Sequence, residues 1–83
     1  MIMKFWYVYV LVCNDGKPYT GCTDDLKDRI KRHAKGYVIA TKNRLPIKLN
    51  AYFAFSDKYN AFKFEKYLKS GSGRAFLKRH LKD

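Results

Sequence analysis

The sequence contains a single glutamate, Glu65, at an unusual place in a predicted helix. Ala61, Phe64 and Leu68 define an apolar arc of that helix, and at about 100° per residue Glu65 falls within the arc. A carboxylate directed at a core is costly unless it is paired or bound to a metal ion. Two interpretations therefore stay open for Glu65. The functional one is a cation ligand, or a group held by basic residues in a cleft; the structural one is an i,i+4 ion pair with Lys69.

Two further pairs of residues have types and spacings that suit chemistry on a phosphate. Arg29 and His33 are four residues apart and share one side of a predicted helix, although such a pair is also typical of a solvated helix surface. An arginine beside a sheet edge can form two hydrogen bonds to a phosphate. Tyr9 and Tyr19 flank an Asp-Gly turn, so a hairpin can bring them together on one face. Gly21 would then let a backbone or ligand approach closely.

Three strands are expected to position these side chains. Residues 5–13 are rich in aromatic and β-branched types and apolar on both faces, which predicts a central strand with Tyr7 in the core. Residues 14–17 form the turn, residues 18–22 return as the second strand, and residues 48–55 alternate as the third. Residues 37–47 lack a clear period and are expected to be loop.

Three helices complete the expected fold. The first begins after the capping residues 23–25, follows Leu26, Ile30 and Ala34, and ends at Gly36. The second follows the cap at residues 56–57 and runs to about residue 69. Residues 70–73 are expected to break the chain before a final short helix over 74–81. The order ββ-α-β-α-α predicts one α+β domain over residues 1–83, a three-stranded antiparallel sheet flanked by helices.

Length and composition exclude several classes of protein. The chain has 83 residues, 47% of them hydrophobic and 17% aromatic, which indicates one small globular domain. The longest apolar stretch, residues 5–13, is too short to cross a bilayer and lacks the cleavage site of a signal peptide. Cys13 and Cys22, with no secretory leader, indicate reduced thiols and a cytoplasmic protein. Their spacing from His33 and His80 does not match a structural zinc site, and no glycine-rich phosphate loop is present.

The charge distribution indicates a polyanionic partner. Eighteen Lys and Arg against seven Asp and Glu give a net charge of +11. No acid lies between Asp28 and Asp57, or between Glu65 and Asp83, and both gaps are rich in basic residues. Two acid-free basic segments favour nucleic acid over a solvated surface of mixed sign, without distinguishing DNA from RNA. The residues predicted to bind nucleic acid are Lys31, Arg32, Lys35, Lys42, Arg44, Lys69, Arg74 and Arg79.

The ordered combination of these residues resembles the GIY-YIG endonuclease superfamily. Residues 7–9 stand at the first tyrosine triplet and residues 19–21 at the second, followed by Arg29, His33 and Glu65 in the family's order. The closer resemblance is to small stand-alone members, similar to the N-terminal nuclease domain of the ABC excinuclease of DNA repair. Residues 64–76 look like the C-terminal signature of that subgroup.

The resemblance implies metal-dependent hydrolysis of DNA phosphodiester bonds, leaving a 5′-phosphate and a 3′-hydroxyl, in DNA repair or recombination. Glu65 would hold a single Mg²⁺ or Mn²⁺, and Arg29 would bind the scissile phosphate. Tyr19 would accept the proton of the attacking water, with Tyr9 hydrogen-bonded nearby and His33 orienting or relaying. Because a free tyrosine titrates near ~10 and a histidine near ~6.5, both Tyr19 and His33 stay open as the general base.

The chain also departs from the family pattern at two positions. No asparagine follows Asn60, where many members carry one after the metal-binding glutamate, and His80 lies near that place. Cys22 stands where the repair nuclease has a lysine. Three functions are therefore weighed: an endonuclease on branched, damaged or single-stranded DNA, which a repair complex could recruit; a nucleic-acid-binding module with the same fold; and a partner-binding domain with an incidental basic surface.

Overall fold

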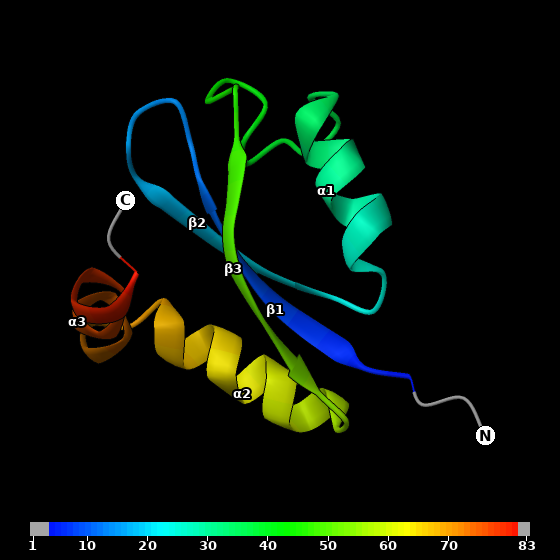
Figure 1. Ribbon diagram of the computed structural model, residues 1–83, viewed down its shortest axis with the longest axis vertical. Coiled ribbons are helices and arrows are strands. Elements are labelled where there is room, and N and C mark those ends of the chain that lie inside the picture. Colours follow the sequence, from blue (N-terminus) through cyan, green and yellow to red (C-terminus); the bar gives the residue numbers. More distant parts are fainter. Residues whose placement is uncertain (1–3, 82–83) are drawn as a thin grey trace.

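A computed structural model describes residues 4–81 and contains a three-stranded antiparallel sheet with three helices (Figure 1). The strand order is β2-β1-β3, so the first strand is central, as its two apolar faces predict. This architecture confirms the expected α+β fold and its ββ-α-β-α-α order. The elements are β1 (Trp6–Val12), β2 (Pro18–Thr23), α1 (Leu26–Ala34), β3 (Lys48–Phe55), α2 (Lys58–Leu68) and α3 (Gly71–His80).

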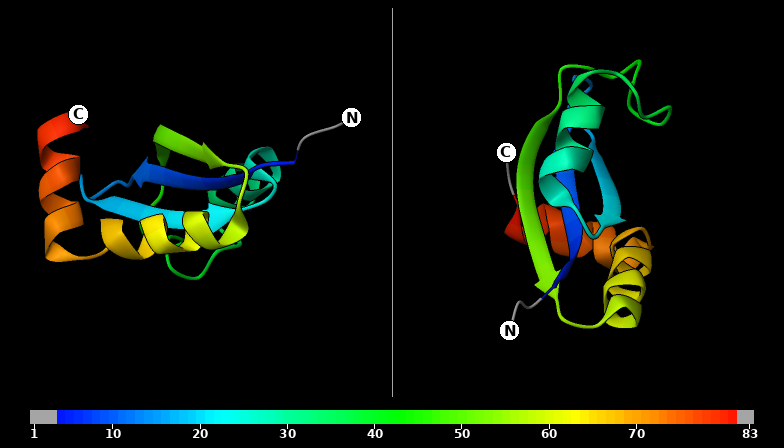
Figure 2. Two further views of the ribbon diagram at one scale, coloured as in Figure 1. Left: turned by 90° about the horizontal axis from the view of Figure 1, so that it is seen from below. Right: turned by 90° about the vertical axis from the view of Figure 1, so that its right-hand side faces the viewer.

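The central strand is covered on both faces, because successive side chains of a strand point to opposite sides. Val8 and Val10 belong to the core cluster that α2 and α3 close, whereas Tyr9 faces α1, which lies over the other side of the sheet (Figure 2). Val8, Tyr9, Val10 and Leu11 are each at most 1% exposed. Within residues 4–81, no helix is both long and apolar enough to cross a membrane.

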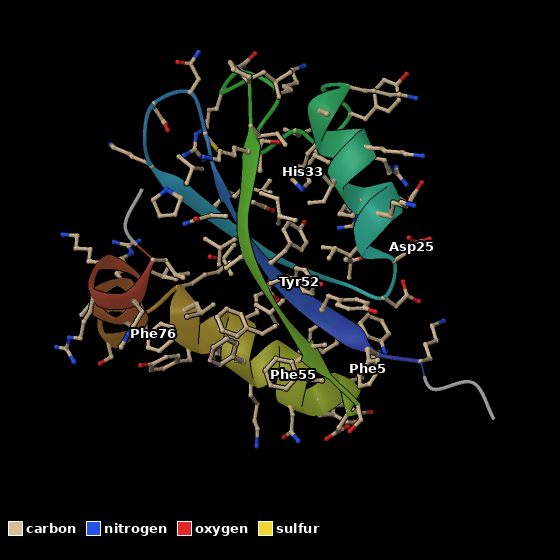
Figure 3. All side chains as sticks on the ribbon, in the orientation of Figure 1. Phe5, Asp25, His33, Tyr52, Phe55 and Phe76 are labelled. Atoms are coloured by element: carbon tan, nitrogen blue, oxygen red, sulfur yellow. The ribbon has the colours of Figure 1, made fainter. Side chains whose placement is uncertain are left out.

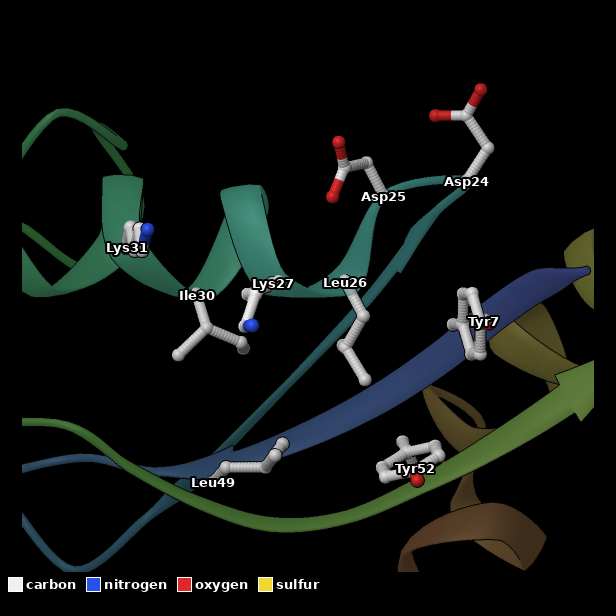
Figure 4. A pocket seen from close by; sticks show the side chains of 9 residues that line it. All are labelled: Tyr7, Asp24, Asp25, Leu26, Lys27, Ile30, Lys31, Leu49 and Tyr52. Carbon is white, nitrogen blue, oxygen red and sulfur yellow. The ribbon is translucent and has the colours of Figure 1, made fainter.

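The α1 face of the sheet is only partly filled. Leu26 and Ile30 of α1 stand over Tyr7, Leu49 and Tyr52 and leave an open groove of about 580 Å³ (Figure 4). Tyr7 is therefore half-buried, with its ring edge-on to the ring of Tyr52 at a centroid distance of 5.9 Å. The prediction that Tyr7 lies in the core is wrong. The expected apolar stripe of α1 is also incomplete, because its third member, Ala34, is exposed.

The predicted turns and caps largely form as expected. Gly16 takes a φ of 76° in the hairpin turn, and Gly36 takes a φ of 77° after α1, two left-handed conformations that favour glycine. The backbone N–H of Asp28 donates to the Asp25 carboxylate (3.1 Å), which caps α1. The Asp57 carboxylate caps α2 by accepting from the Tyr59 N–H (3.3 Å).

The start of α3 differs from the expectation. Residues 70–73 are not a breaker: Ser70 is the N-cap, its Oγ accepts from the Gly73 N–H (3.2 Å), and the helix begins at Gly71. The serine cap satisfies an N–H that the first helical turn would otherwise leave unpaired, and this outweighs the low helix propensity of glycine. The turn also lies so close to α2 that Gly73 is buried against its last residues.

We expect Gly73→Ala to lower the free energy of unfolding by about 1–3 kcal/mol, the usual range for forcing a methyl group into a packed site. A Cβ at Gly73 would overlap the Tyr67 carbonyl and the Leu68 Cα, which are backbone atoms and cannot rotate away. Gly71→Ala is the matched control, because a Cβ there meets nothing within 4 Å. Urea unfolding of the two variants measures the difference, and equal stabilities would contradict the close approach of α2 and α3.

Candidate active site

A buried chain of three polar side chains joins α1, β1 and the loop after α1. The Tyr9 hydroxyl lies 2.9 Å from His33 Nε2, and His33 Nδ1 lies 2.7 Å from the Thr41 hydroxyl. Tyr9 is 1% exposed, and His33 and Thr41 are fully buried. His33 reaches from α1 toward the sheet (Figure 3). The solvated-surface interpretation of His33 is therefore wrong for this fold, since His33 is the one buried residue of α1.

The hairpin register brings the two tyrosines to one face, as predicted. Tyr9 pairs with Gly21, and Leu11 pairs with Tyr19, so the tyrosines are diagonal neighbours on adjacent strands. Both rings contact the imidazole of His33, with centroid distances of 5.5 Å for Tyr9 and 5.4 Å for Tyr19. Tyr19 is half-buried on the edge strand β2, which leaves it closer to solvent than Tyr9.

Gly21 provides the space that Tyr9 occupies. A Cβ built on Gly21 would overlap the hydroxyl and ring carbons of Tyr9. The glycine is required here for close approach of a side chain, as the sequence suggests, and its φ is not in the left-handed region. Any larger residue at this position must displace the phenol from His33.

The electrostatics keep the buried pair neutral near pH 7. Burial, with the neighbouring Tyr19, raises the pKa of Tyr9 to about 12, although the Arg29 guanidinium acts in the opposite direction. Burial, followed by the Arg29 charge, lowers the pKa of His33 below its usual 6.5. Tyr9 therefore keeps its proton, and His33 is an uncharged imidazole that is buried from solvent.

We expect the free energy of unfolding to decrease as the pH is lowered through the titration of His33. In the unfolded chain the imidazole of His33 takes up a proton near pH 6.5, whereas in the folded chain it does so only at a lower pH. The free energy of unfolding should thus be flat above 6.5 and decline below it, until the pH reaches the folded pKa. Urea unfolding between about pH 5 and 8 measures this slope. His33→Gln removes the group and should remove the slope, and an unchanged slope in that variant would contradict the assignment.

Thr41 is a site residue that the sequence analysis missed, because it lies in the aperiodic segment 37–47. The hydroxyl groups of Tyr9 and Thr41 can each donate or accept, so the neutral imidazole carries its proton on Nε2, toward Tyr9, or on Nδ1, toward Thr41. The hydrogen bond with Thr41 biases the choice between these tautomers and ties the loop to α1.

We expect Thr41→Val to shift the tautomer population of His33, because the isosteric side chain cannot hydrogen-bond to Nδ1. The ¹⁵N shifts of the His33 ring report the tautomer directly. The buried polar nitrogen loses its partner, so the free energy of unfolding should also fall by about 1–3 kcal/mol. Thr41→Ser keeps the hydroxyl and should restore the tautomer. Wild-type ring shifts in the valine variant would show that Thr41 does not set it.

Glu65 extends the cluster from the other side of β2. Its Oε2 accepts from Lys69 Nζ at 3.1 Å, so the i,i+4 ion pair is present, and the side chain is 22% exposed and not enclosed in the core. Burial, followed by the Glu65 charge, raises the pKa of the Cys22 thiol, while Arg29 lowers it. Glu65 also adds to the raised pKa of Tyr9, after burial and Tyr19. The charges of Glu65 on α2 and Arg29 on α1 thus influence the same two groups of the sheet, Cys22 and Tyr9.

The donor set at this edge fits a hard divalent cation better than zinc. Among residues 4–81 there is no group of three or more His, Cys, Asp or Glu that could hold a metal ion. Glu65 offers a single carboxylate that is partly open to water. Mg²⁺ tolerates this arrangement, because it keeps several waters and takes phosphate oxygens from a substrate. Structural zinc needs about four protein ligands and does not fit.

The eight basic residues predicted to bind nucleic acid do not all have the same surroundings. Arg44 forms two hydrogen bonds to Asp15, at 2.9 and 3.1 Å, and holds the hairpin turn to the loop after α1. Lys69 stands at the site, with Nζ 5.9 Å from the Tyr19 ring centroid. The other six are exposed and lie outside the buried cluster: Lys31, Arg32, Lys35, Lys42, Arg74 and Arg79. Arg44 therefore also has a structural role, and binding of nucleic acid stays a prediction for all eight residues.

The fold and this edge together define the class of the protein. A GIY-YIG catalytic domain model matches residues 5–79, and the chain belongs to the GIY-YIG family of nucleases. The chain is 43% identical over 70 residues to a UPF0213 protein of Lacticaseibacillus paracasei, covering 83% of this chain and 79% of that protein. It is 45% identical over 69 residues to a UPF0213 protein of Halalkalibacterium halodurans, covering 82% and 73%.

The fold is also that of a solved relative. The solution NMR structure of a UPF0213 protein from Bacillus halodurans aligns with a TM-score of 0.58 and 40% sequence identity, over 90% of this chain and 83% of the other. The similarity confirms the predicted family and fold class.

Proposed function

We propose that this protein is a metal-dependent endonuclease that hydrolyses phosphodiester bonds of DNA. The proposal rests on the convergence of Tyr19, Arg29 and Glu65, from three different elements, at one edge of the sheet. At this edge Arg29 supplies a positive charge that can bind a phosphate, Glu65 supplies a carboxylate that can bind a metal ion, and Tyr19 supplies a phenol that can take part in proton transfer. A net charge of +11 suits a polyanionic substrate.

Each side chain has a role that its surroundings allow. Arg29 binds the scissile phosphate and offsets the charge that develops there. Tyr19 is the proposed acceptor of the proton from the attacking water, because it is only half-buried and lies closer to solvent than Tyr9. Tyr9 and His33 are too buried to contact that water and hold Tyr19 in place.

Glu65 is the proposed ligand of a single Mg²⁺ or Mn²⁺. The bound ion would supply charge neutralisation for the phosphate and for the leaving 3′-oxygen. Lys69 shares the carboxylate, so it holds Glu65 at the edge while one carboxylate oxygen stays available. We further propose that the substrates are intermediates of DNA repair or recombination and that a repair complex recruits the protein.

A cleavage assay with labelled branched, nicked and single-stranded DNA tests the proposal. We expect cutting that appears with Mg²⁺ or Mn²⁺, disappears with chelator and leaves 5′-phosphate ends. Arg29→Ala, purified in parallel, controls for contaminating nucleases and should lose activity by about 10²–10³-fold, the usual cost of removing one charge-stabilising donor. Preferential cutting of branched substrates would support a role in repair or recombination.

A nucleic-acid-binding module without turnover is the second candidate. The Glu65–Lys69 ion pair favours it, because the carboxylate already has a partner within the fold. Salt-sensitive binding of DNA with no cutting in either protein would establish this function and overturn the enzyme.

A further inference from the structure

A second cleft lies on the α3 side of the sheet. It has a volume of about 1020 Å³ and is bounded by the hairpin turn, β3 and α3. Its floor is apolar and consists of Val10, Val12, Leu77 and Leu81. Val10 and Leu77 belong to the buried core, so the floor is rigid and not a loose surface patch. In Figure 1 the hairpin turn and α3 stand at the same side of the molecule.

The rim of this cleft is positively charged. Lys17 of the hairpin turn and Arg74 and Lys78 of α3 line it, and none of the three makes an ion pair among residues 4–81. The acid that lines the cleft, Asp15, is already bound by Arg44. Arg74 and Lys78 come from the second acid-free basic segment of the sequence, and with Lys17 of the hairpin turn they leave three positive charges available at the cleft.

An apolar floor under a basic rim complements an unpaired nucleotide. The face of a base can pack on the floor while the neighbouring phosphates reach the lysine and arginine side chains. A duplex keeps its bases stacked inside and offers only phosphates, so it would leave the floor uncovered. An acidic peptide would match the rim but not the apolar floor. The chemistry therefore favours single-stranded nucleic acid.

The position of the cleft relative to the catalytic edge supports the same occupant. Pro18 lines the cleft, and the next residue of β2, Tyr19, contacts His33 at the proposed site. Adjacent residues of a strand point to opposite faces, so the cleft and the site lie on the two sides of the same edge strand. A strand that passes around the β2 edge by Lys69 can reach both.

We propose that this cleft binds an unpaired segment of the DNA strand next to the scissile phosphate. This inference rests on the proposed function. Duplex DNA with a single-stranded flap or junction arm would then be held at two places, and a plain duplex at one. The cleft, and not the catalytic edge, would select substrates with unpaired nucleotides.

Binding of a labelled oligothymidylate to Glu65→Ala without metal tests the cleft separately from catalysis. Replacing Arg74 and Lys78 together by alanine should weaken binding about tenfold and reduce the salt slope by roughly 0.7 for each phosphate that is no longer neutralised. Both side chains are exposed on a helix, where alanine is well tolerated. The control, Lys27→Ala with Lys63→Ala, removes the same charge away from the cleft and should change affinity less than twofold.

Amide-shift mapping by ¹H–¹⁵N spectra identifies where the oligonucleotide sits. We expect shifts at Gly16, Lys17, Leu77 and Lys78, and a loss of affinity with an oligonucleotide of abasic residues. Shifts confined to the catalytic edge, equal effects of the two double variants, or equal binding of abasic and normal oligonucleotides would each overturn the proposal. Failure of cleavage with these shifts retained would count against the enzyme only.

Discussion

Glu65→Ala should reduce metal-dependent cleavage by on the order of 10³-fold, because about 4 kcal/mol of charge stabilisation depends on the ion that this carboxylate would hold. The fold should survive the change. The ion pair with Lys69 is partly exposed, and pairs of this kind on a helix contribute only about 0.3–0.5 kcal/mol. Rates are measured on the best substrate of the panel, and unfolding by urea checks the fold.

Lys69→Ala is the matched control for this prediction. It breaks the same ion pair but leaves the carboxylate in place, so the dependence of the rate on Mg²⁺ concentration should persist. If Glu65 served only in the ion pair with Lys69, the two variants would have the same cleavage rate and the same stability. Wild-type cleavage by Glu65→Ala would show that the metal assignment is wrong and that the glutamate serves only the helix.

The strands can be predicted closely because their signals are local. Residues 5–13 are rich in aromatic and β-branched side chains, and β1 covers Trp6–Val12. The third strand, expected over residues 48–55, is Lys48–Phe55. The Asp-Gly turn sets the hairpin register, and that register brings Tyr9 beside Tyr19. The predicted start of α3 is wrong, because propensity alone does not include the cap from Ser70 or the packing of Gly73 on α2.

The burial of His33 shows what the helix pattern can reveal. The i+4 spacing predicts Ala34 on the apolar stripe with His33 on its flank, yet His33 is buried and Ala34 is exposed. At about 100° per residue around the helix axis, His33 lies about 20° from the direction of Leu26, whereas Ala34 lies about 80° from it. The spacing of seven residues therefore indicates that His33 faces the sheet. A polar residue on the apolar face of a helix indicates that its side chain forms a buried hydrogen bond.

The partners in the loop cannot be predicted in this way. Thr41 and Arg44 lie in a segment without period, and each contacts a residue on another element: Thr41 binds His33, and Arg44 binds Asp15. Such pairings depend on how the chain returns over the sheet, which no local pattern encodes. They nevertheless decide which basic residues stay available and which tautomer the buried histidine adopts.

Gly21→Ala should reduce cleavage by about 10²-fold without removing any proposed catalytic group, since a misplacement of about 1 Å at a site can have this cost. The new methyl group would overlap the Tyr9 hydroxyl and ring, so the phenol must leave His33, and the contact of His33 with Tyr19 changes with it. The free energy of unfolding should also fall by about 1–3 kcal/mol from overpacking.

A double variant separates the overlap from a general loss of stability. Tyr9→Leu shortens the side chain that Gly21→Ala would overlap, so the two changes together should destabilise less than the sum of the single changes. Cleavage should stay low in the double variant, because the hydrogen bond between Tyr9 and His33 is absent. Additive stabilities would contradict the overlap, and wild-type cleavage by Gly21→Ala would show that Tyr9 has no part in positioning the site. Recovery of stability without recovery of activity would show that cleavage needs the Tyr9 side chain itself and not only a stable fold.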